Sequence, residues 1–279
     1  MVRERVADNV YVFTSEVYAQ VNAGAIVGPE WSVVIDTLPV PSETIEMRDY
    51  LELRLNRPVR YVINTHYHAD HTYGNCWFPN ATVVGDATCR QLMDKRGREA
   101  LKVAKEHNRE MRDVEIVLPS IVFDVGSISL KVGKRTLKLI PLPGHSPDGL
   151  GVLVLEDRVL FAGDSMLPVP YIVDGDPDTL AASMKLIPRL SLESLVQGHG
   201  DVILRGEVQN SVRANLTYLT TLEKEARKAS RRRDPEGYLA TVDVERCGKS
   251  RILLNGLAEE LHRRNLEAIY QRQFGSDDG

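Results

Sequence analysis

Short apolar runs separated by polar turns fill most of the chain before Gly206. Runs such as Val59–Ile63, which is rich in β-branched residues, are typical of short buried strands. Longer and more polar segments at Pro41–Leu55, residues 86–112 and Asp176–Leu190 predict helices between the strands. The predicted strands are Val10–Phe13, Ala19–Val27, Trp31–Ile35, Val59–Ile63, Ile121–Phe123, Ile128–Val132, Leu137–Leu142, Leu150–Leu155, Val159–Ala162 and Ser194–Gln197.

The apolar pattern changes to a helical period from about Gly206. Apolar residues then recur at three- and four-residue steps, which is typical of helices with one buried face. Between two such stretches lies a polar hinge with three consecutive arginines, Arg231–Arg233. Because acidic residues flank these arginines, we interpret them as a solvated loop rather than a nucleic-acid patch. The residues that define the two predicted helices are Val208, Val212, Leu216, Leu219, Leu222, Leu254, Leu257, Leu261, Leu266 and Ile269.

Composition narrows the class of protein without giving a function. Of the 279 residues, 43% are hydrophobic and 27% are charged, which excludes a disordered or collagen-like chain. The net charge of −4 argues against a broad nucleic-acid-binding surface. No apolar stretch approaches the roughly 18 residues of a membrane span. Three scattered cysteines and a charged start without a signal-peptide pattern predict a cytoplasmic protein.

Four side chains that can bind a metal lie within six residues, directly after the predicted strand Val59–Ile63. They are His66, His68, Asp70 and His71. On an extended segment His66 and His68 point to the same side, and the following turn lets the other two approach from another direction. Imidazole and carboxylate groups suit zinc, iron or manganese. This density of ligand-type side chains predicts a metal site.

Three later positions share one local pattern, in which a potential ligand follows a glycine at the end of a predicted strand. They are Gly144-His145, Gly163-Asp164 and Gly198-His199. Glycine allows tight turns and close approach of the backbone to a crowded site. Together with the first cluster, these positions supply five histidines and two aspartates, which are enough ligands for two metal ions.

The ordered pattern HxHxDH, GH, GD and GH resembles the metallo-β-lactamase superfamily over residues 9–205. The resemblance implies an α/β fold, a four-layer αββα sandwich, as a catalytic domain over residues 1–205. We expect a C-terminal helical extension over residues 206–279 to pack on that domain. By resemblance, Asp36 supports the metal loops through hydrogen bonds. The implied ligands are His66, His68 and His145 for a first metal ion, Asp70, His71 and His199 for a second, and Asp164 as a bridge.

The mechanism implied by this ligand set is hydrolysis by a hydroxide that bridges two divalent metal ions. Asp70 is the ligand best placed to orient the hydroxide. Zinc is the expected metal, with iron or manganese as alternatives, because His and Asp ligands suit all three. The expected substrate is a small molecule with an ester, thioester, lactone, β-lactam or phosphoester bond.

Departures from particular branches of the superfamily narrow the choice. The largest subclass of true β-lactamases has arginine where this chain has His71 and cysteine where it has Asp164. The full ligand set most resembles glyoxalase-II-like thioesterases, lactonases and phosphotriesterase-like hydrolases. Three alternatives stay open: a mononuclear-iron oxygenase resembling persulfide dioxygenases, an RNA or DNA nuclease, and a binding module without catalysis.

Outside the ligand set, the sequence supports simpler assignments. We expect Tyr67, Tyr73 and Tyr171 to line the substrate pocket, the last from an apolar, proline-rich segment after Asp164. Two histidines in charged helical sequence, His107 and His262, are expected to be exposed to solvent. Cys76 is interpreted as a small buried side chain rather than a ligand. The C-terminal helices leave two roles open, a homodimer face or a lid over the pocket, and neither nucleic acid nor membrane is an expected partner.

Overall fold

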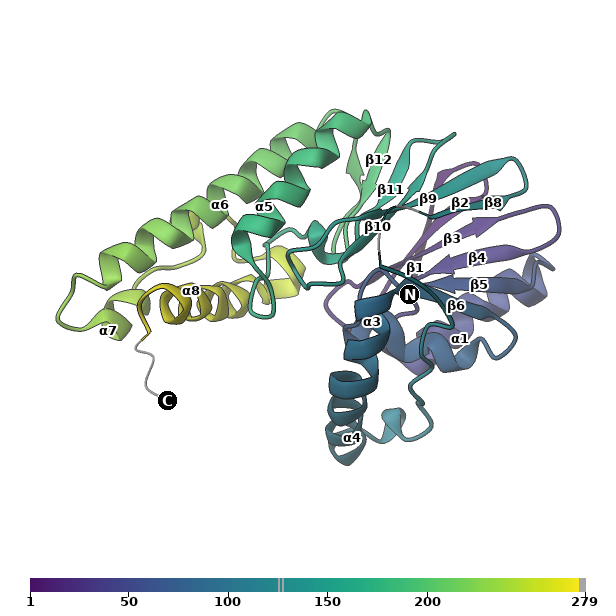
Figure 1. Cartoon of the computed structure of the whole chain (residues 1–279), viewed down its shortest axis with the longest axis horizontal. Coiled ribbons are helices and arrows are strands. Elements are labelled where there is room, and N and C mark those ends of the chain that lie inside the picture. The colour runs from purple at the N-terminus through teal and green to yellow at the C-terminus, as the bar shows by residue number, and fades with distance from the viewer. Residues whose placement is uncertain (125, 127, 276–279) are drawn as a thin grey trace.

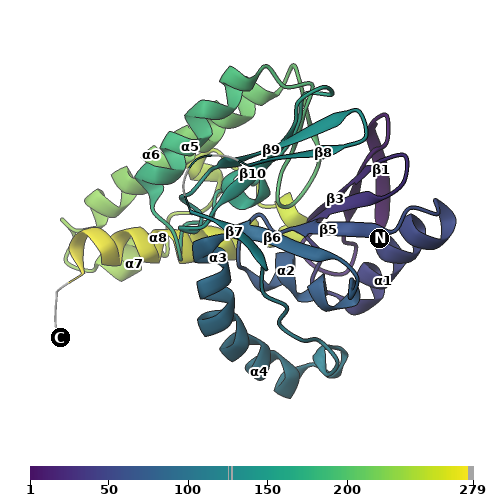
Figure 2. The same cartoon turned by 45° about the vertical axis from the view of Figure 1, so that its right-hand side comes forward.

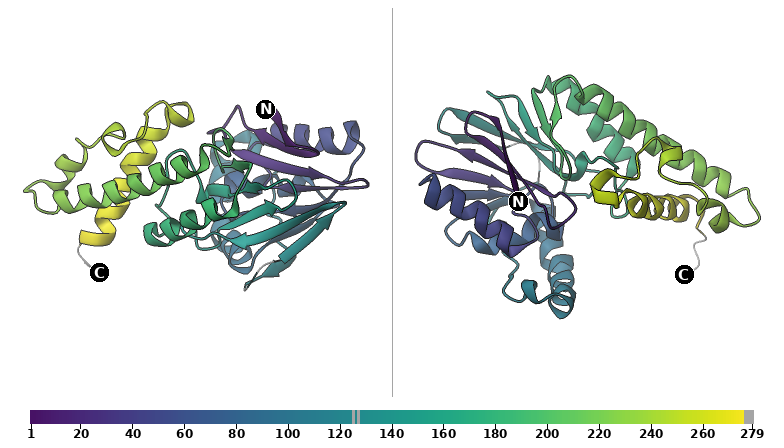
Figure 3. Two further views of the ribbon diagram at one scale, coloured as in Figure 1. Left: turned by 90° about the horizontal axis from the view of Figure 1, so that it is seen from above. Right: turned by 180° about the vertical axis from the view of Figure 1, so that it is seen from behind.

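The strands of the computed structural model, which describes residues 1–124, 126 and 128–275, form two sheets that face each other (Figures 1 and 3). The strands are β1 Val2–Ala7, β2 Val10–Thr14, β3 Asn22–Val27, β4 Ser32–Ile35, β5 Val59–Ile63, β6 Thr82–Asp86, β7 Ile121–Phe123, β8 Ile128–Val132, β9 Arg135–Pro141, β10 Leu150–Val154, β11 Val159–Phe161, β12 Ser194–Val196 and β13 Ile203–Leu204. The α-helices are α1 Pro41–Asp49, α2 Ala69–Thr72, α3 Ala87–Leu92, α4 Arg98–His107, α5 Pro177–Leu186, α6 Val208–Ala229, α7 Pro235–Leu239 and α8 Ala258–Phe274. Shorter helical turns continue several of these helices.

Each sheet combines antiparallel and parallel pairs. The first sheet has the order β1-β2-β3-β4-β5-β6-β7, antiparallel from β1 to β4 and parallel from β4 to β7. The second has the order β13-β12-β11-β10-β9-β8, in which only β11 and β12 run parallel. Parallel neighbouring strands end at the same edge of a sheet. The loops at the carboxyl ends of β4, β5 and β11 therefore gather at one edge of the sandwich.

The core between the sheets is built from alternate residues of buried strands. Val33 and Ile35 of β4 face the second sheet and pack in one cluster with Val152 and Phe161. Val34, between them in sequence, packs on the opposite face with α1. This alternation follows from the two-residue period of a strand and gives the first sheet two buried faces.

Helices cover the outer face of each sheet. Met47 of α1 packs on the first sheet, and Leu180 of α5 and Val212 of α6 pack on the second. The order of layers is therefore helix, sheet, sheet, helix, which confirms the predicted four-layer αββα sandwich. The helices α3 and α4 project from the first sheet as a separate arm (Figure 2).

Every predicted strand is present in the structure. The prediction misses three further strands, in which the apolar run is short or absent. The first missed strand, β1, is exposed at four of its six positions, three of them charged, as suits an edge strand. The other two, β6 and β13, have only short apolar cores. The segment 86–112 is helical as predicted, but it is divided into α3 and α4 with a π-helical turn between them.

The chain after Leu204 is helical. The helix α6 runs along the second sheet and beyond it. The chain returns to the sandwich after α7, and α8 then runs away from it beneath α6 (Figure 1). Leu219 and Leu222 of α6 pack with Leu266 and Ile269 of α8, which are residues that defined the predicted helices. Among the described residues, no helix is both long enough and apolar enough to cross a membrane.

Lys249 is a partly buried cation within this helical extension, and it makes the stability of the protein depend on pH. Its ammonium donates to Asn215 Oδ1 at 2.5 Å. Burial lowers the pKa of Lys249 to about 8. The unfolded chain keeps this proton up to about pH 10.4. The folded state therefore binds fewer protons between these two values, so the free energy of unfolding rises with pH in this window.

We expect Lys249→Met to remove this titration, so that the stability of the wild type relative to the variant rises by about 2 kcal/mol between pH 7 and pH 10. The rise occurs because the wild-type lysine becomes neutral in the folded state over this range. Urea unfolding of both proteins at the two pH values measures it, with the exposed Lys224→Met as the matched control. A stability difference that stays constant with pH would contradict the prediction.

Candidate metal centre

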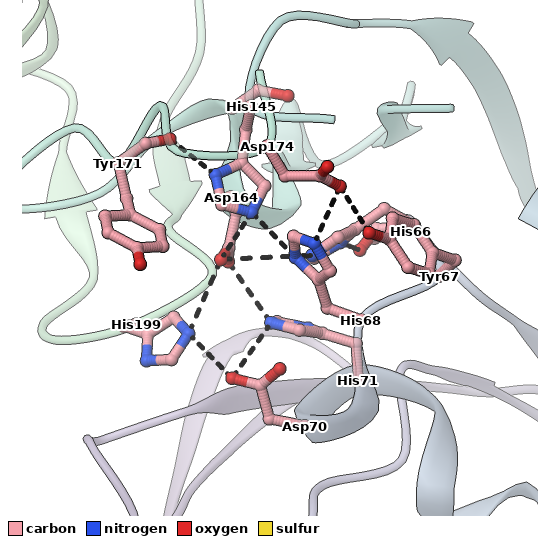
Figure 4. Close-up of polar contacts among 12 residues, drawn as sticks. His66, Tyr67, His68, Asp70, His71, His145, Asp164, Tyr171, Asp174 and His199 are labelled. Carbon is pink, nitrogen blue, oxygen red and sulfur yellow. Dashed lines mark hydrogen bonds and ion pairs between the residues drawn. The ribbon is translucent and has the colours of Figure 1, made fainter. Parts of the chain in front are cut away.

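The seven predicted ligands converge at one edge of the sandwich, on loops that follow the carboxyl ends of strands (Figure 4). His66 through His71 follow β5 of the first sheet. His145, Asp164 and His199 follow β9, β11 and β12 of the second sheet. The site therefore lies where both sheets end, and neither sheet alone carries the full set.

The first group of donor atoms is formed by three imidazole nitrogens. His68 Nδ1 lies 3.0 Å from His66 Nε2 and 2.9 Å from His145 Nε2. Asp164 Oδ2 lies 3.3 Å from the same His145 nitrogen. One atom from each of these four residues lies within 4.8 Å of the others, so together they could hold a metal ion.

The second group contains Asp70, His71 and His199, whose donor atoms also lie within 4.8 Å of one another. His199 Nε2 is 3.3 Å from Asp70 Oδ2, and His71 Nε2 is 3.2 Å from Asp164 Oδ1. Asp164 thus contacts both groups, because Oδ1 approaches His71 and Oδ2 approaches both His145 and His199.

Each of the five histidines has its second ring nitrogen beside an acceptor outside the ligand set. The acceptors are Thr65 Oγ1 for His66, Asp174 Oδ2 for His68, Asp36 Oδ2 for His71, the Tyr171 carbonyl for His145 and the Ala19 carbonyl for His199. A histidine that donates from its outer nitrogen keeps a lone pair on the inner one. This arrangement is typical of metal-ligating histidines.

Burial and charge at the site fit a divalent cation. Burial lowers the pKa of His66 well below its ordinary value and that of His145 to about 4, so both rings are neutral at pH 7. At His199 burial acts in the same direction, but the Asp164 carboxylate outweighs it and raises the pKa to about 10. The carboxylates thus demand compensating positive charge, which a divalent cation supplies while the histidines stay neutral.

Two buried polar atoms of the candidate metal centre lack a hydrogen bond. His71 Nε2 and Asp164 Oδ1 are buried and lie 3.2 Å apart, but neither makes a hydrogen bond, with the other or with any other described residue. An unpaired buried polar atom costs about 1–3 kcal/mol. Coordination of a metal ion would satisfy both atoms, so the donor set fits the predicted group.

Asp36 connects the first cluster to the sheet, as the resemblance implies. This buried residue follows β4, and its carboxylate accepts from Thr65 N at 2.8 Å and Thr65 Oγ1 at 2.7 Å. Its Oδ2 also lies 2.9 Å from His71 Nδ1. One carboxylate therefore fixes the start of the metal-binding loop and the orientation of His71.

Asn22 ties the His199 loop to the opposite sheet and was not singled out from the sequence. Its amide nitrogen donates to the Gln197 carbonyl at 3.0 Å and the Gly200 carbonyl at 2.7 Å. Its backbone N–H donates to the Gly198 carbonyl. These bonds hold the backbone on both sides of His199 against the first residue of β3.

Asp174 is a further residue at the site that the sequence pattern does not reveal. Its Oδ2 lies 3.5 Å from His68 Nε2 and also accepts from the Tyr67 hydroxyl. Its Oδ1 accepts from Arg96 at 2.7 Å. The bond from His68 is the main cause that lowers the pKa of Asp174, which keeps it a carboxylate. It therefore fixes the orientation of His68.

Replacing Asp174 with alanine is expected to free the outer nitrogen of His68 and to weaken zinc binding. Loss of the hydrogen-bond partner at the outer nitrogen of a ligating histidine typically weakens metal affinity 10- to 100-fold. Competition with a chelator of known affinity measures this change. Asp94→Ala removes an exposed carboxylate that pairs only with Arg98 in the same region and serves as the control. Equal zinc affinity in the two variants would refute the role of Asp174.

A cavity of about 440 Å³ opens onto the ligand cluster. His68, Asp70, His145, Asp164 and His199 form its inner end. The outer walls combine residues from the sandwich with residues from the helical extension, where Glu260 and Arg264 of α8 form an ion pair. The outer lining residues are Tyr18, Ala19, Ala69, Leu167, Tyr171, Leu254, Leu257, Glu260, Leu261 and Arg264.

The structure corrects the predicted pocket tyrosines. Of the three predicted tyrosines, only Tyr171 lines this cavity. Tyr67 turns its hydroxyl to Asp174 and packs with Met93 of the α3 segment. Tyr73 is buried with Leu101 in a small cluster beneath α4. Tyr67 is the middle residue of the HxH motif and Tyr73 directly follows α2, and both side chains are directed into packing contacts.

The histidines outside the ligand set have different environments. His107 is exposed, as predicted. The prediction for His262 is wrong, because it is only 1% exposed and hydrogen bonds to Tyr218 and the Val242 carbonyl. The charged neighbours that suggested exposure lie on the other face of α8. Cys76 is half-buried and stands outside both candidate ligand groups.

Comparison with known proteins identifies relatives of the sandwich. A family model described as the metallo-beta-lactamase superfamily matches residues 18–207. The chain is 27% identical over 172 residues to a beta-lactamase-like protein 2 homolog of Caenorhabditis elegans, covering 61% of this chain and 52% of that one. It is also 27% identical over 173 residues to the thioesterase pkgB of Emericella nidulans, covering 62% of this chain and 43% of that one. The chain thus spans about half the length of the curated relatives it matches.

Solved structures share the fold at low sequence identity. A metallo-beta-lactamase from Pontibacter korlensis is 18% identical and aligns with a TM-score of 0.62 over 77% of this chain and 98% of that one. The sec-alkylsulfatase Pisa1 from a Pseudomonas species is 16% identical and aligns with a TM-score of 0.75 over 99% of this chain and 51% of that one. The second alignment includes the C-terminal helices.

Proposed function

Because the chain belongs to the metallo-β-lactamase superfamily, we propose that it is a metal-dependent hydrolase of small esters or thioesters that carry an apolar acyl group. The observation that carries this proposal is the cavity, whose inner end holds five of the seven candidate ligands and whose outer walls are largely apolar. The ligand cluster provides the reactive end, and the outer walls provide the binding surface.

The proposed site holds two divalent ions, with zinc as the expected metal. His66, His68 and His145 would hold one, Asp70, His71 and His199 the other, and Asp164 would contact both. When bound, such ions supply Lewis-acid activation of water and of the substrate's carbonyl oxygen. The protein's part is to hold the ligands rigidly through the acceptors at the outer nitrogens, and to place the acyl carbon at the inner end of the cavity.

Asp70 is the ligand that we propose orients the attacking water. Its side chain is 20% exposed and lines the cavity, whereas Asp164 is more deeply buried at 7%. Burial alone would raise the pKa of Asp70, but the neighbouring His71 and His199 hold it below its usual range. The carboxylate is therefore ionised at neutral pH and can accept a hydrogen bond from water.

The substrate class follows from the chemistry of the outer walls. Leu167 comes from the loop after β11, while Leu257 and Leu261 come from the helical extension. Leu257 is 38% exposed and lines the cavity. Ligand sites with such walls favour apolar groups. Three of the relatives that the chain matches are described as thioesterases, namely pkgB and the atrochrysone carboxyl ACP thioesterases of Pseudocercospora fijiensis and Claviceps purpurea.

The test is hydrolysis by protein of measured metal content, using acyl thioesters and p-nitrophenyl esters of increasing chain length. We expect kcat/KM to rise up to about fourfold per added methylene, because each buried methylene contributes about 0.8 kcal/mol. A lactone, a β-lactam and a phosphodiester complete the panel. Absence of ester and thioester turnover, together with oxygen consumption by iron-loaded protein given a persulfide, would replace the proposal with an oxygenase.

Leu261→Asn is expected to flatten this dependence on chain length by adding a polar group to the outer wall. The reaction with the shortest substrate should change little, because Leu261 lies away from the ligands. Leu186→Asn, which alters a 45% exposed leucine of α5 outside the cavity, is the matched control. An unchanged chain-length series in Leu261→Asn would show that the acyl group binds elsewhere.

We further propose a reducing, cytoplasmic setting and a small-molecule substrate rather than nucleic acid. Cys76, Cys89 and Cys247 are free thiols, which suits a reducing compartment. The net charge of −4 gives no general attraction for a phosphate backbone.

A further inference from the structure

The side chain of Asn265, in the middle of α8, is fully buried against the loop that follows Asp164. Its amide nitrogen donates to the Pro170 carbonyl at 2.7 Å, and its Oδ1 accepts from the Ile172 N–H at 3.0 Å. These two hydrogen bonds hold the backbone on both sides of Tyr171. A single side chain of the helical extension therefore fixes the direction of the Tyr171 peptide groups.

The Tyr171 carbonyl contacts the candidate metal centre directly. It accepts from His145 Nδ1 at 2.7 Å, while His145 Nε2 faces His68 and Asp164 (Figure 4). The direction of this carbonyl thus decides both the tautomer and the rotation of the His145 ring. A chain of contacts runs from Asn265 through the Tyr171 backbone to a ligand nitrogen.

Further buried polar groups prevent the Asn265 amide from turning around. His262 Nε2 donates to the Val242 carbonyl at 2.9 Å, so its Nδ1 accepts from the Tyr218 hydroxyl at 3.1 Å. The Tyr218 oxygen in turn accepts from Asn265 Nδ2 at 3.1 Å. Each of these hydrogen bonds has one defined donor and one defined acceptor, so a reversed Asn265 amide would not match its neighbours. A satisfied buried network of this kind fixes a single arrangement of its members.

We propose that Asn265 is a positioning residue for the metal ligand His145, so that the helical extension completes the metal centre although it lies outside the region matched by the family model. The inference rests on the metal site of the proposed function and not on the bond that is cleaved. Arg272, farther along α8, also donates to the Gly175 carbonyl, so the same helix holds the loop at a second point.

The test compares zinc affinity in Asn265→Ala and in Leu266→Ala. Leu266 is the next residue, is 2% exposed and lines the groove between α7 and α8, so its replacement disturbs the helix without touching the loop bonds. Chelator competition should show about tenfold weaker zinc binding in Asn265→Ala and wild-type affinity in Leu266→Ala. The absorption spectrum of the cobalt-substituted protein should change only in Asn265→Ala, because that spectrum reports ligand geometry. Thermal unfolding of both variants measures their shared loss of stability.

Wild-type zinc affinity and an unchanged cobalt spectrum in Asn265→Ala would overturn the proposal and leave Asn265 a purely structural residue. If this variant does not fold, Tyr218→Phe decides, because it keeps the packing volume and removes only the phenol that orients the Asn265 amide. A smaller loss of zinc affinity, with a shifted cobalt spectrum, supports the proposal, and an unchanged protein refutes it. Failure of the wild type to bind zinc or cobalt would instead refute the metal site itself.

Discussion

Replacing Asp164 with alanine is expected to remove bound metal and hydrolytic activity together. Asp164 is the one carboxylate that approaches both ligand groups, with contacts of 3.3 Å to His145 and 3.2 Å to His71. Its loss leaves buried histidines facing one another without a shared anion. Because Lewis-acid stabilisation is worth several kcal/mol, we expect kcat/KM to fall by at least about a thousandfold.

Metal content by elemental analysis and turnover of the best ester or thioester measure both losses on the same sample. Glu193→Ala is the control, because it removes a carboxylate that pairs with Arg158 and Arg205 on the surface and leaves the ligand loops intact. An Asp164→Ala protein with wild-type metal content and turnover would overturn the assignment of this residue.

Gly198→Ala is expected to be nearly as damaging, although it changes no ligand. A Cβ atom at Gly198 would lie 1.8 Å from Asp164 Oδ1 and 2.8 Å from the Gly163 carbonyl carbon. Either the carboxylate or the backbone must therefore move. Overpacking of this kind typically costs about 1–3 kcal/mol of stability. Since the displaced atom is a proposed ligand, we also expect zinc affinity to fall by at least about 100-fold, comparable to losing an outer partner at the upper end of its range.

Gly206→Ala separates this steric effect from the general cost of replacing a glycine. A Cβ atom at Gly206 meets no atom within 4 Å. Thermal unfolding and zinc competition on the two variants are the measurements. Wild-type zinc affinity in Gly198→Ala would mean that the Asp164 carboxylate can move without loss of function, contrary to the proposed bridge.

The sequence predicts the ligand set because the ligands are local and repetitive. Four of the seven lie in one short motif, and the others each follow a glycine at the end of an apolar run. The function of those glycines becomes clear only in three dimensions. At Gly198 the side chain is missing because the Asp164 carboxylate occupies the space.

The residues that orient the ligands could not be predicted in this way. Asp174 is hydrogen bonded to Tyr67, which lies 107 residues away in sequence, and Asn22 is hydrogen bonded to the Gly200 carbonyl, 178 residues away. No spacing rule connects residues so far apart in the chain. An aspartate or asparagine in a loop also has ordinary explanations in turn formation, so its type carries little information.

The C-terminal helix shows how a periodic pattern can be correct and still incomplete. The spacing of Leu254, Leu257 and Leu261 predicts a buried helical face, and the segment is indeed largely helical. These leucines line the cavity rather than the inside of the helical extension. The residues that link α8 to the centre, His262 and Asn265, are polar, so hydrophobic periodicity assigns them to the exposed side. The buried network satisfies them in pairs, and such pairing is invisible to a scale that scores each residue alone.

The division of the ligands between the two sheets has a thermodynamic consequence. His66, His68, Asp70 and His71 belong to one half of the sandwich, and His145, Asp164 and His199 to the other. Each proposed cation would take ligands from both halves and would act as a cross-link between them, so binding favours only the state in which the halves are docked. At a free metal concentration 100 times the dissociation constant, this linkage adds about 2.7 kcal/mol to the free energy of unfolding. The melting temperature of the protein should therefore follow the free metal concentration around it, so the supply of the ion would set the lifetime of the folded protein as well as the rate of the proposed reaction.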